Sequence, residues 1–415
     1  MAITKTTVRK FILISFIAFF AAAKTFASGG ETGKFEPGPF ILDHIGDSYE
    51  WHIATLGETH ISIPLPVILL SENNGLQIFS SSNFHHGHEP YNGFHIAHEG
   101  ENKGKIVEEL SQEQTIALLQ KLSVEEFNAL AATYLGEEAA PEEITALQEN
   151  FKNKKYEDVI AAVGLNNFYT KPIDLSITKN VMSLFFSVIL LLIIFLSVAK
   201  AYKKREGKAP SGLQNLMEIL IIFVRDDIAK ASIGEKKYEK YTPFLLTIFF
   251  FILINNLLGL VPIFPGGANL TGNIAVTLVL ALFTFAITSF SGNKNYWLHV
   301  FWTPGVPWWL KLPLPLMFIV EFSGIFIKPF VLMVRLFANI TAGHIIALGF
   351  FSLIFIFGEL HIAAGYGVSV VSLAFTIFMT ILELLVAFIQ AFVFTLLSAI
   401  YFGMATEEHH HAEAH

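Results

Sequence analysis

Ionisable and amide side chains recur at intervals of seven residues within two long apolar stretches of this chain. In the first stretch Glu321, Lys328 and Arg335 follow this spacing, and Asn339 lies one helical turn after Arg335. A heptad drifts by only about 20° around a helix, so these four side chains are expected to form one stripe. A charge near the centre of a lipid bilayer costs at least ~2.5 kcal/mol, so each such residue needs a partner or a function.

The second stretch repeats this arrangement with groups that bind or exchange protons. Glu383 and Gln390 are a heptad apart, and Tyr401 falls on nearly the same helical face. Thr376 and Thr380 precede Glu383 by one to two turns. A single membrane Gln or His usually only hydrogen-bonds a neighbouring helix. A set of such residues on two adjacent stretches instead favours an ion path.

Arg335 and His344 differ in the chemistry that they can perform. Arginine does not release its proton at an accessible pH, so Arg335 is a fixed charge that lowers the pKa of a passing carboxylate and repels cations. His344 lies nine residues later, on the opposite helical face and about 13 Å along the axis. His344 and Glu383 can both exchange protons near neutral pH once burial and mutual interaction shift their pKa values.

Structural interpretations of the same charges are also consistent with the sequence. Glu321 and Lys328 lie toward one end of their stretch, where they can extend to the membrane interface or pair with one another. Arg335 lies deeper in the apolar stretch, and there it can bind backbone carbonyl groups rather than serve an ion path.

The composition places the second half of the chain in a membrane. Of the 415 residues, 53% are hydrophobic and only 15% are charged, and the mean hydropathy is +0.54. The formal net charge of −8 comes mainly from the N-terminal half and leaves no basic stripe for nucleic acid. The lack of cysteine excludes disulfides, thiolate metal sites and cysteine nucleophiles. The sequence also contains no Gly-rich phosphate loop followed by Lys-Ser or Lys-Thr.

The membrane part is expected to be all α-helical with five passages. Apolar runs of spanning length occur at 181–199, 244–261, 274–290, about 312–357 and about 368–401, and a loop at 359–367 separates the last two. The second and third runs form a hairpin, and the last two are too long for a perpendicular crossing, so they must be tilted or kinked. Lysine and arginine concentrate at 200–240, which places this connection in the cytoplasm, the N-terminus outside and the C-terminus inside.

An amphipathic helix is expected within the connection at 200–240. Ser211 is placed to cap this helix. Apolar residues then recur at helical spacing, which favours a helix that lies along the membrane surface, at Leu213, Leu216, Leu220, Phe223 and Val224.

The first 175 residues have a more polar character. Residues 1–27 combine basic residues with an apolar run, which predicts a secretory signal peptide, and an uncleaved anchor is the alternative. Residues 28–175 are expected to form a small exported domain of mixed α/β structure, with strand-like stretches at 51–63 and 76–79 and one helical acidic segment at 112–163. His85, His86 and His88 are candidate metal ligands, but their spacing matches no zinc pattern and favours a solvated loop.

The two polar stretches resemble those of a known family, the a subunit of ATP synthase (ATPase subunit 6). Its signature helix is similar to Lys328-Pro329 followed by Arg335-Leu-Phe-Ala-Asn339-Ile-Thr-Ala-Gly343-His344. Its last helix resembles residues 383–390 and 404–409, its hairpin resembles 256–262 and 273–277, and its first helix resembles 186–200. The resemblance covers about 177–409, so a membrane domain is expected at 176–409 and a His-rich cytoplasmic tail at 410–415.

The resemblance assigns roles to individual residues. The family's essential arginine corresponds to Arg335 and the neighbouring amide to Asn339, and its membrane Glu and Gln positions correspond to Glu321 and Gln390. Some members have Glu and His where this chain has His344 and Glu383. The swapped order keeps one acid and one imidazole across the helix pair. Tyr401 joins these residues on the expected proton path.

What the resemblance implies is a non-catalytic stator in the F0 sector, with two half-channels that face a rotating ring of c subunits. The chain would need no cofactor, because ATP chemistry belongs to other subunits. Its expected partners are the c ring, the b-subunit peripheral stalk, the lipid bilayer and, indirectly, the F1 sector. Its expected location is a bacterial inner membrane, with the N-terminus in the periplasm. H⁺ and Na⁺ both fit, because the ring supplies much of the ion site.

Two other functions fit this sequence less well. A self-contained ion-coupled secondary transporter should show an internal repeat with broken helices at matching positions, and the sequence contains none. A membrane anchor for a metal-handling exported domain would not need Arg335, His344, Glu383 and Gln390 together.

Overall fold

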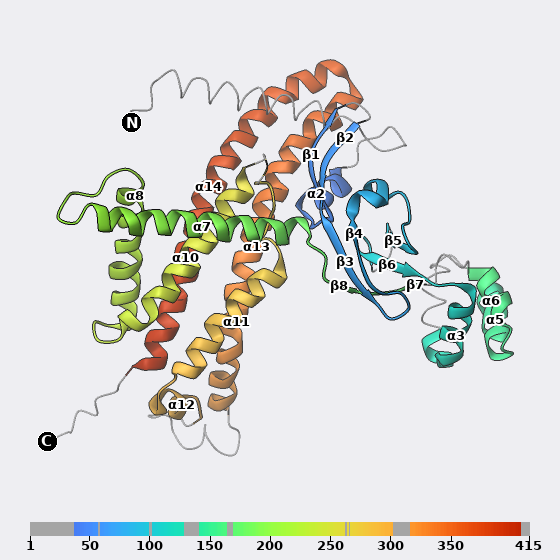
Figure 1. Cartoon of the computed structure of the whole chain (residues 1–415), viewed down its shortest axis with the longest axis horizontal. Helices are drawn as coiled ribbons and strands as arrows, with labels where there is room; N and C mark the ends of the chain where they lie inside the picture. Colours follow the sequence, from blue (N-terminus) through green and yellow to red (C-terminus); the bar gives the residue numbers. More distant parts are fainter. Residues whose placement is uncertain are drawn as a thin grey trace. The chain divides into compact units, whose positions relative to one another are not determined.

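The computed structural model describes residues 37–56, 59–98, 102–127, 141–163, 169–261, 264, 266–301 and 316–407. Two compact units make up the chain (Figure 1). The N-terminal unit comprises Ser48–His52 and Ser62–Lys179. The membrane unit comprises Asn180–His415 with the described parts of Met1–Asp47 and Ile53–Ile61. The expected signal peptide at 1–27 and the tail at 410–415 lie outside the described residues.

Five helices of the described chain are long and apolar enough to cross a membrane, as the hydropathy predicts. Each coincides with one of the expected apolar runs. They are α7 (Lys179–Lys204), α10 (Tyr238–Leu260), α11 (Ile274–Ser291), α13 (Leu316–Leu360) and α14 (Ile362–Thr406).

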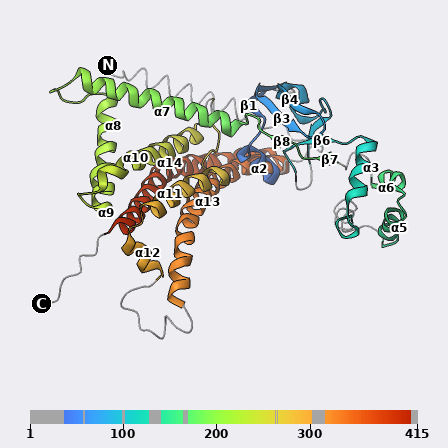
Figure 2. The ribbon, with the colours of Figure 1, turned by 60° about the horizontal axis from the view of Figure 1, so that its bottom comes forward.

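The two last helices, α13 and α14, run side by side (Figures 1 and 2). Each has 45 residues and is therefore about 68 Å long at 1.5 Å per residue. The hydrocarbon layer is about 30 Å thick, so helices of this length must be strongly tilted in it. α13 continues through Pro329, which lies inside the helix.

The expected loop at 359–367 is wrong. His361 alone separates α13 from α14, and its ring nitrogen Nδ1 caps the new helix by accepting from the Ala363 backbone N–H at 3.2 Å. A Cβ atom at Gly365 would lie 2.7 Å from the Gly358 Cα atom, so the two helices touch backbone to backbone beside the joint.

The connection between α7 and α10 contains the expected helix, but its cap was predicted wrongly. α8 (Leu213–Ile222) begins after Gly212, whose φ of 62° is left-handed, and no side chain caps it. Ser211 lies one residue too early. The helix continues through a π-helical segment, η3 (Phe223–Lys230), and a short turn, α9 (Ala231–Ile233). A further helix, α12 (Lys294–Phe301), follows α11.

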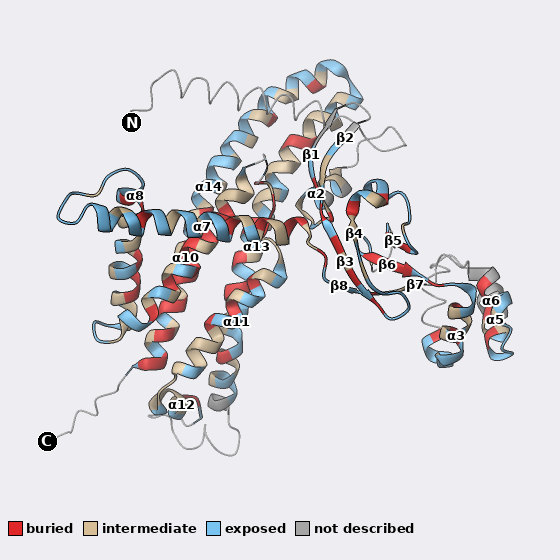
Figure 3. Cartoon of the chain, viewed as in Figure 1, coloured by how far each residue is buried: buried red, intermediate tan, exposed pale blue. Residues whose placement is uncertain are grey.

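An aromatic core fixes α14 against α10 and η3. Phe249 of α10 and Phe402 of α14 are fully buried, and Ile228 of η3 is buried with them. The ring of Tyr241 stacks on Phe402 with centroids 5.1 Å apart. Buried residues line these inner faces, whereas much of the outer surface of the five long helices is exposed and apolar (Figure 3). Such a distribution is expected for helices that face lipid or other subunits.

The N-terminal unit has the expected mixed α/β structure, with two small antiparallel sheets. In the first, β3 (Pro66–Ser71) lies between β4 (Gly75–Ser80) and β8 (Ile173–Asp174). In the second, β6 (Ile106–Glu109) lies between β5 (Phe94–Ile96) and β7 (Tyr169–Thr170). A separate two-stranded sheet pairs β1 (Glu50–Leu56) with β2 (Thr59–Pro64).

The helices fall in the expected range but do not form one continuous segment. They are α3 (Gln112–Lys121), α5 (Pro141–Lys152) and α6 (Tyr156–Val163), and α2 (Pro37–Ile45) precedes the strands. Phe127 and Phe151 stack at the centre of the helical part, with parallel rings 3.9 Å apart.

A buried carboxylate connects the two three-stranded sheets. Glu108 of β6 is 2% exposed. Its oxygens accept from Ser71 Oγ at 2.6 Å, Asn74 Nδ2 at 2.9 Å and Thr170 Oγ1 at 3.3 Å. Three donors compensate for the loss of water around this carboxylate, so it acts as a structural tie between strands.

Candidate ion path in the membrane unit

The structure brings His344 and Glu383 together between α13 and α14. His344 Nδ1 lies 3.3 Å from Glu383 Oε1, and the two side chains are only 17% and 12% exposed. One glycine makes room for Glu383, whereas a second lies near His344 at a distance where a Cβ atom would fit. A Cβ atom at Gly343 would lie 2.7 Å from Glu383 Oε1, and one at Gly259 of α10 would lie 3.7 Å from His344 Nε2. The imidazole and the carboxylate are therefore within ion-pair distance in this enclosed site.

Arg335 lies on the other side of α13. Its side chain is exposed, as is that of Asn339, while the neighbouring Leu332 and Leu336 are buried against the rest of the unit. Among the described residues, Arg335 makes no hydrogen bond and no ion pair. The guanidinium therefore remains available to a group outside this chain.

Glu321 and Lys328 do not share the exposed surface of Arg335. Glu321 Oε2 lies 3.9 Å from His299 Nδ1 of α12, and Lys328 Nζ lies 5.6 Å from the ring centroid of Tyr401 in α14. Both are partly buried. The side chains of the predicted stripe therefore have different neighbours, because successive heptad positions lie about 10 Å apart along α13 and meet different helices there.

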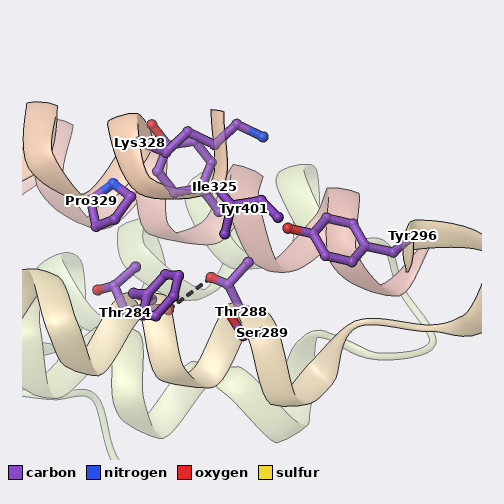
Figure 4. A pocket seen from close by; sticks show the side chains of 9 residues that line it. Thr284, Thr288, Ser289, Tyr296, Ile325, Lys328, Pro329 and Tyr401 are labelled. Carbon is purple, nitrogen blue, oxygen red and sulfur yellow. Dashed lines mark hydrogen bonds between the residues drawn. The ribbon is translucent and has the colours of Figure 1, made fainter. Parts of the chain in front are cut away.

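A small pocket lies beside Lys328 where four helices meet, and several of the residues that line it carry a hydroxyl group (Figure 4). Tyr401 forms one wall, and Tyr296 directs its hydroxyl toward the space. Burial, followed by the negative charge of Glu321, raises the pKa of Tyr296, so its hydroxyl stays protonated and can donate a hydrogen bond. α11 contributes the remaining hydroxyls, from Thr284, Thr288 and Ser289.

Comparison with known proteins identifies the family. The family model described as ATP synthase A chain matches residues 181–403, which is more than half of the chain. ATP synthase subunit a of Chloroherpeton thalassium is 42% identical over 284 residues, which cover 66% of this chain and 80% of the relative. Subunit a 2 of Prosthecochloris aestuarii is 47% identical over 248 residues, which cover 58% and 72%.

This chain belongs to the ATP synthase subunit a family. It is a multi-pass membrane protein and the proton-conducting stator subunit of the membrane sector, and not a self-contained transporter. ATP chemistry takes place in the catalytic sector and not in this subunit. Residues 40–126 match a second family, described as a domain of unknown function (DUF8433). Subunit a therefore carries an additional N-terminal domain here.

Polar residues that the sequence analysis did not select as site residues hold α14 of subunit a in register. Asn256 of α10 donates to the Ala387 carbonyl of α14 at 3.2 Å and accepts from Thr271 Oγ1 at 2.6 Å. Gln390, which follows Ala387 by about one turn, is 5% exposed. Neither Asn256 nor Thr271 belongs to a heptad pattern, and their contacts depend on which helices become neighbours.

Two threonines selected from the sequence have local roles. Thr376 donates to the Ser372 carbonyl at 2.8 Å, and Thr380 donates to the Thr376 carbonyl at 2.9 Å. Such bonds satisfy a hydroxyl within its own helix. Neither threonine contacts the His344–Glu383 pair among the described hydrogen bonds.

The His-rich loop of the N-terminal unit does not assemble a metal site among the described residues. His85 pairs with Glu89 at 3.0 Å, His86 pairs with Glu50 at 2.8 Å, and His88 stacks on His98. His85 and His86 both adopt left-handed backbone angles. The imidazoles are thereby distributed to different carboxylates and do not converge.

Proposed function

We propose that this subunit provides two half-channels to a rotating ring of c subunits and that Arg335 separates them. The exposed, unpaired position of Arg335 on α13 carries this proposal. A fixed cation on that surface lowers the pKa of a ring carboxylate that approaches it, so the carboxylate releases its proton there. The same charge repels any cation that would pass directly between the half-channels. Asn339, one turn away, adds an amide that can hydrogen-bond the same carboxylate.

The entry path runs from the outside past the His344–Glu383 pair and Gln390. The short distance and low exposure of the pair support this assignment, because a buried acid and imidazole exchange one proton without creating an isolated charge. A proton then neutralises a ring carboxylate, which travels through the lipid for most of a rotation. Each elementary charge that crosses 100 mV supplies ~2.3 kcal/mol to this rotation.

The exit path leaves through the pocket beside Lys328 and Tyr401. Lys328 and Tyr401 line this pocket, and Lys328 lies about two turns before Arg335 on α13. Glu321 and His299 form the cytoplasmic end of this path. Their carboxylate and imidazole are 3.9 Å apart and partly exposed, which suits them to pass a proton to water.

The basic residues at 200–240 support a cytoplasmic connection between α7 and α10. On this topology the signal peptide at 1–27 directs residues 28–175 to the periplasm, and 176–409 form the membrane domain in a bacterial inner membrane. The tail at 410–415 is cytoplasmic. The c ring and the b-subunit peripheral stalk are direct partners, the F1 sector is an indirect one, and no partner is a nucleic acid.

Replacement of Arg335 by alanine tests the proposal directly. Arg335→Ala should abolish ATP-driven proton pumping in membrane vesicles, while the complex remains assembled. Val331→Ala, one turn earlier on α13 and also exposed, is the matched control and should pump at the normal rate. Undiminished coupled pumping in Arg335→Ala would overturn the assigned role.

A further inference from the structure

The first sheet of the N-terminal unit has two faces of different burial. Along β3, Val67, Leu69 and Ser71 are buried, and the residues between them point to the opposite side. The strand register pairs Ile68 with Ile78 and Leu70 with both Leu76 and Ile173. The backbone N–H of Leu175 donates to the Ile68 carbonyl, which extends the same face by one residue. We call this set the outer sheet face: Ile68, Leu70, Leu76, Ile78, Ile173 and Leu175.

The outer sheet face is apolar and open. Leu76, Ile78, Ile173 and Leu175 are each 60–65% exposed, and Leu70 is 44% exposed. All six members are branched aliphatic residues, and none is charged. When one face of an antiparallel sheet is open to water, the residues on that face are normally polar. A continuous apolar face on three strands instead marks a surface that another apolar phase covers.

The chain itself indicates which phase that is. β8 ends at Asp174, and α7, the first spanning helix, begins at Lys179. Five residue steps span at most about 17 Å. Backbone hydrogen bonds from Ile177 to Pro66 and from Lys179 to Ser48 shorten the usable reach further. Only a short segment of chain therefore connects the outer sheet face to the helix that enters the bilayer, whichever side of the membrane the domain occupies.

We propose that the outer sheet face rests on the lipid bilayer surface, with its aliphatic side chains inserted at the headgroup–acyl boundary. Amphipathic helices that lie in this region bury their apolar faces by about 5–10 Å, and we expect a similar depth for the side chains of the outer sheet face. The face carries no lysine or arginine, so apolar insertion and not attraction to anionic headgroups provides the binding. The inference needs only that α7 spans the membrane and is independent of the proposed ion path.

The natural absence of cysteine allows a clean test. Ile78→Cys in the full chain, carrying an environment-sensitive fluorophore, is reconstituted into phosphatidylcholine vesicles. Glu125→Cys, an exposed site of the same unit outside the sheet, is the matched control. Leu175→Cys provides a second probe if the first variant is poorly produced.

Lipids with brominated acyl chains should quench the labels at Ile78 and Leu175 several-fold more than the label at Glu125, and aqueous iodide should show the reverse order. Vesicles with anionic lipid should give the same result. Equal iodide quenching at all three sites would overturn the proposal. Protection of Ile78 from both quenchers would also overturn it, because a protein surface and not lipid would then cover the face.

Discussion

The Glu383 carboxylate fits against α13 because residue 343 is glycine. A Cβ atom there would lie 2.7 Å from Glu383 Oε1 and 3.2 Å from its Cγ, well inside van der Waals contact. The backbone of α13 thus forms one wall of the site that holds the acid against His344. Position 343 controls this geometry without contributing a polar group.

Gly343→Ala should therefore displace Glu383 and lengthen its contact with His344. Misplacement of a reacting group by about 1 Å can lower a rate by up to about 10²-fold, so a loss of about 10-fold or more in ATP-driven proton pumping is expected. Gly349→Ala is the matched control, because a Cβ atom at that glycine of α13 would meet no atom within 4 Å. Equal pumping by the two variants would show that the displacement of Glu383 is unimportant.

Exchange of the pair tests whether its two members act as a unit. His344→Ala should slow pumping less than Arg335→Ala does, because only Arg335 is proposed to separate the half-channels. The double variant His344→Glu/Glu383→His keeps one acid and one imidazole at the 3.3 Å contact and should recover activity relative to either single exchange. Normal rates in both His344→Ala and Glu383→Ala would remove the pair from the path.

The proposed exit can be tested by a double-mutant cycle on Glu321 and His299. Glu321→Gln and His299→Gln should each slow pumping, and the double variant should lose less than the sum of the two effects because their side chains face one another. Ser323→Ala, whose hydroxyl donates to its own helix at Ile319, is the control and should be neutral. Strictly additive effects would contradict a shared step.

Glu108→Ala should weaken the N-terminal unit without altering proton transport. It leaves the buried hydroxyl of Ser71 and the donors of Asn74 and Thr170 without their acceptor, which costs about 1–3 kcal/mol. Limited proteolysis of intact membranes at increasing temperature should show earlier cleavage within the unit. The exposed Glu113→Ala is the control, and identical cleavage profiles would mean that Glu108 is not a structural tie.

Periodicity and hydropathy predicted the spans because each of the five long helices contains a strongly apolar run of about 18 residues or more. The heptads also marked the polar side chains correctly as residues of two paired helices. The same rules failed at 359–367, where they predicted a loop but only His361 separates α13 from α14. They also missed β7 and β8, because two-residue strands carry no detectable alternation.

The contact partners of individual side chains could not be predicted from the sequence. Glu321 and Lys328 differ from Arg335 by only one or two heptad steps, yet one faces α12, another faces Tyr401 and the third is exposed. Which helix each side chain of α13 meets depends on where the surrounding helices lie, and the spacing of residues within α13 does not give those positions. His299 was not predicted as a site residue for the same reason, because it contacts Glu321 only where α12 approaches α13.

The one-residue joint at His361 also has a mechanical consequence. A stator must resist the drag of a turning rotor, and if α13 and α14 face the rotor as proposed, a long flexible linker between them would let them slide under that load. Here the joint is as short as a chain reversal permits, and Gly365 lies directly on Gly358 beside it. The joint therefore contains no linker in which α13 and α14 could slide, so we expect a force applied at Arg335 to reach the helix that holds Glu383.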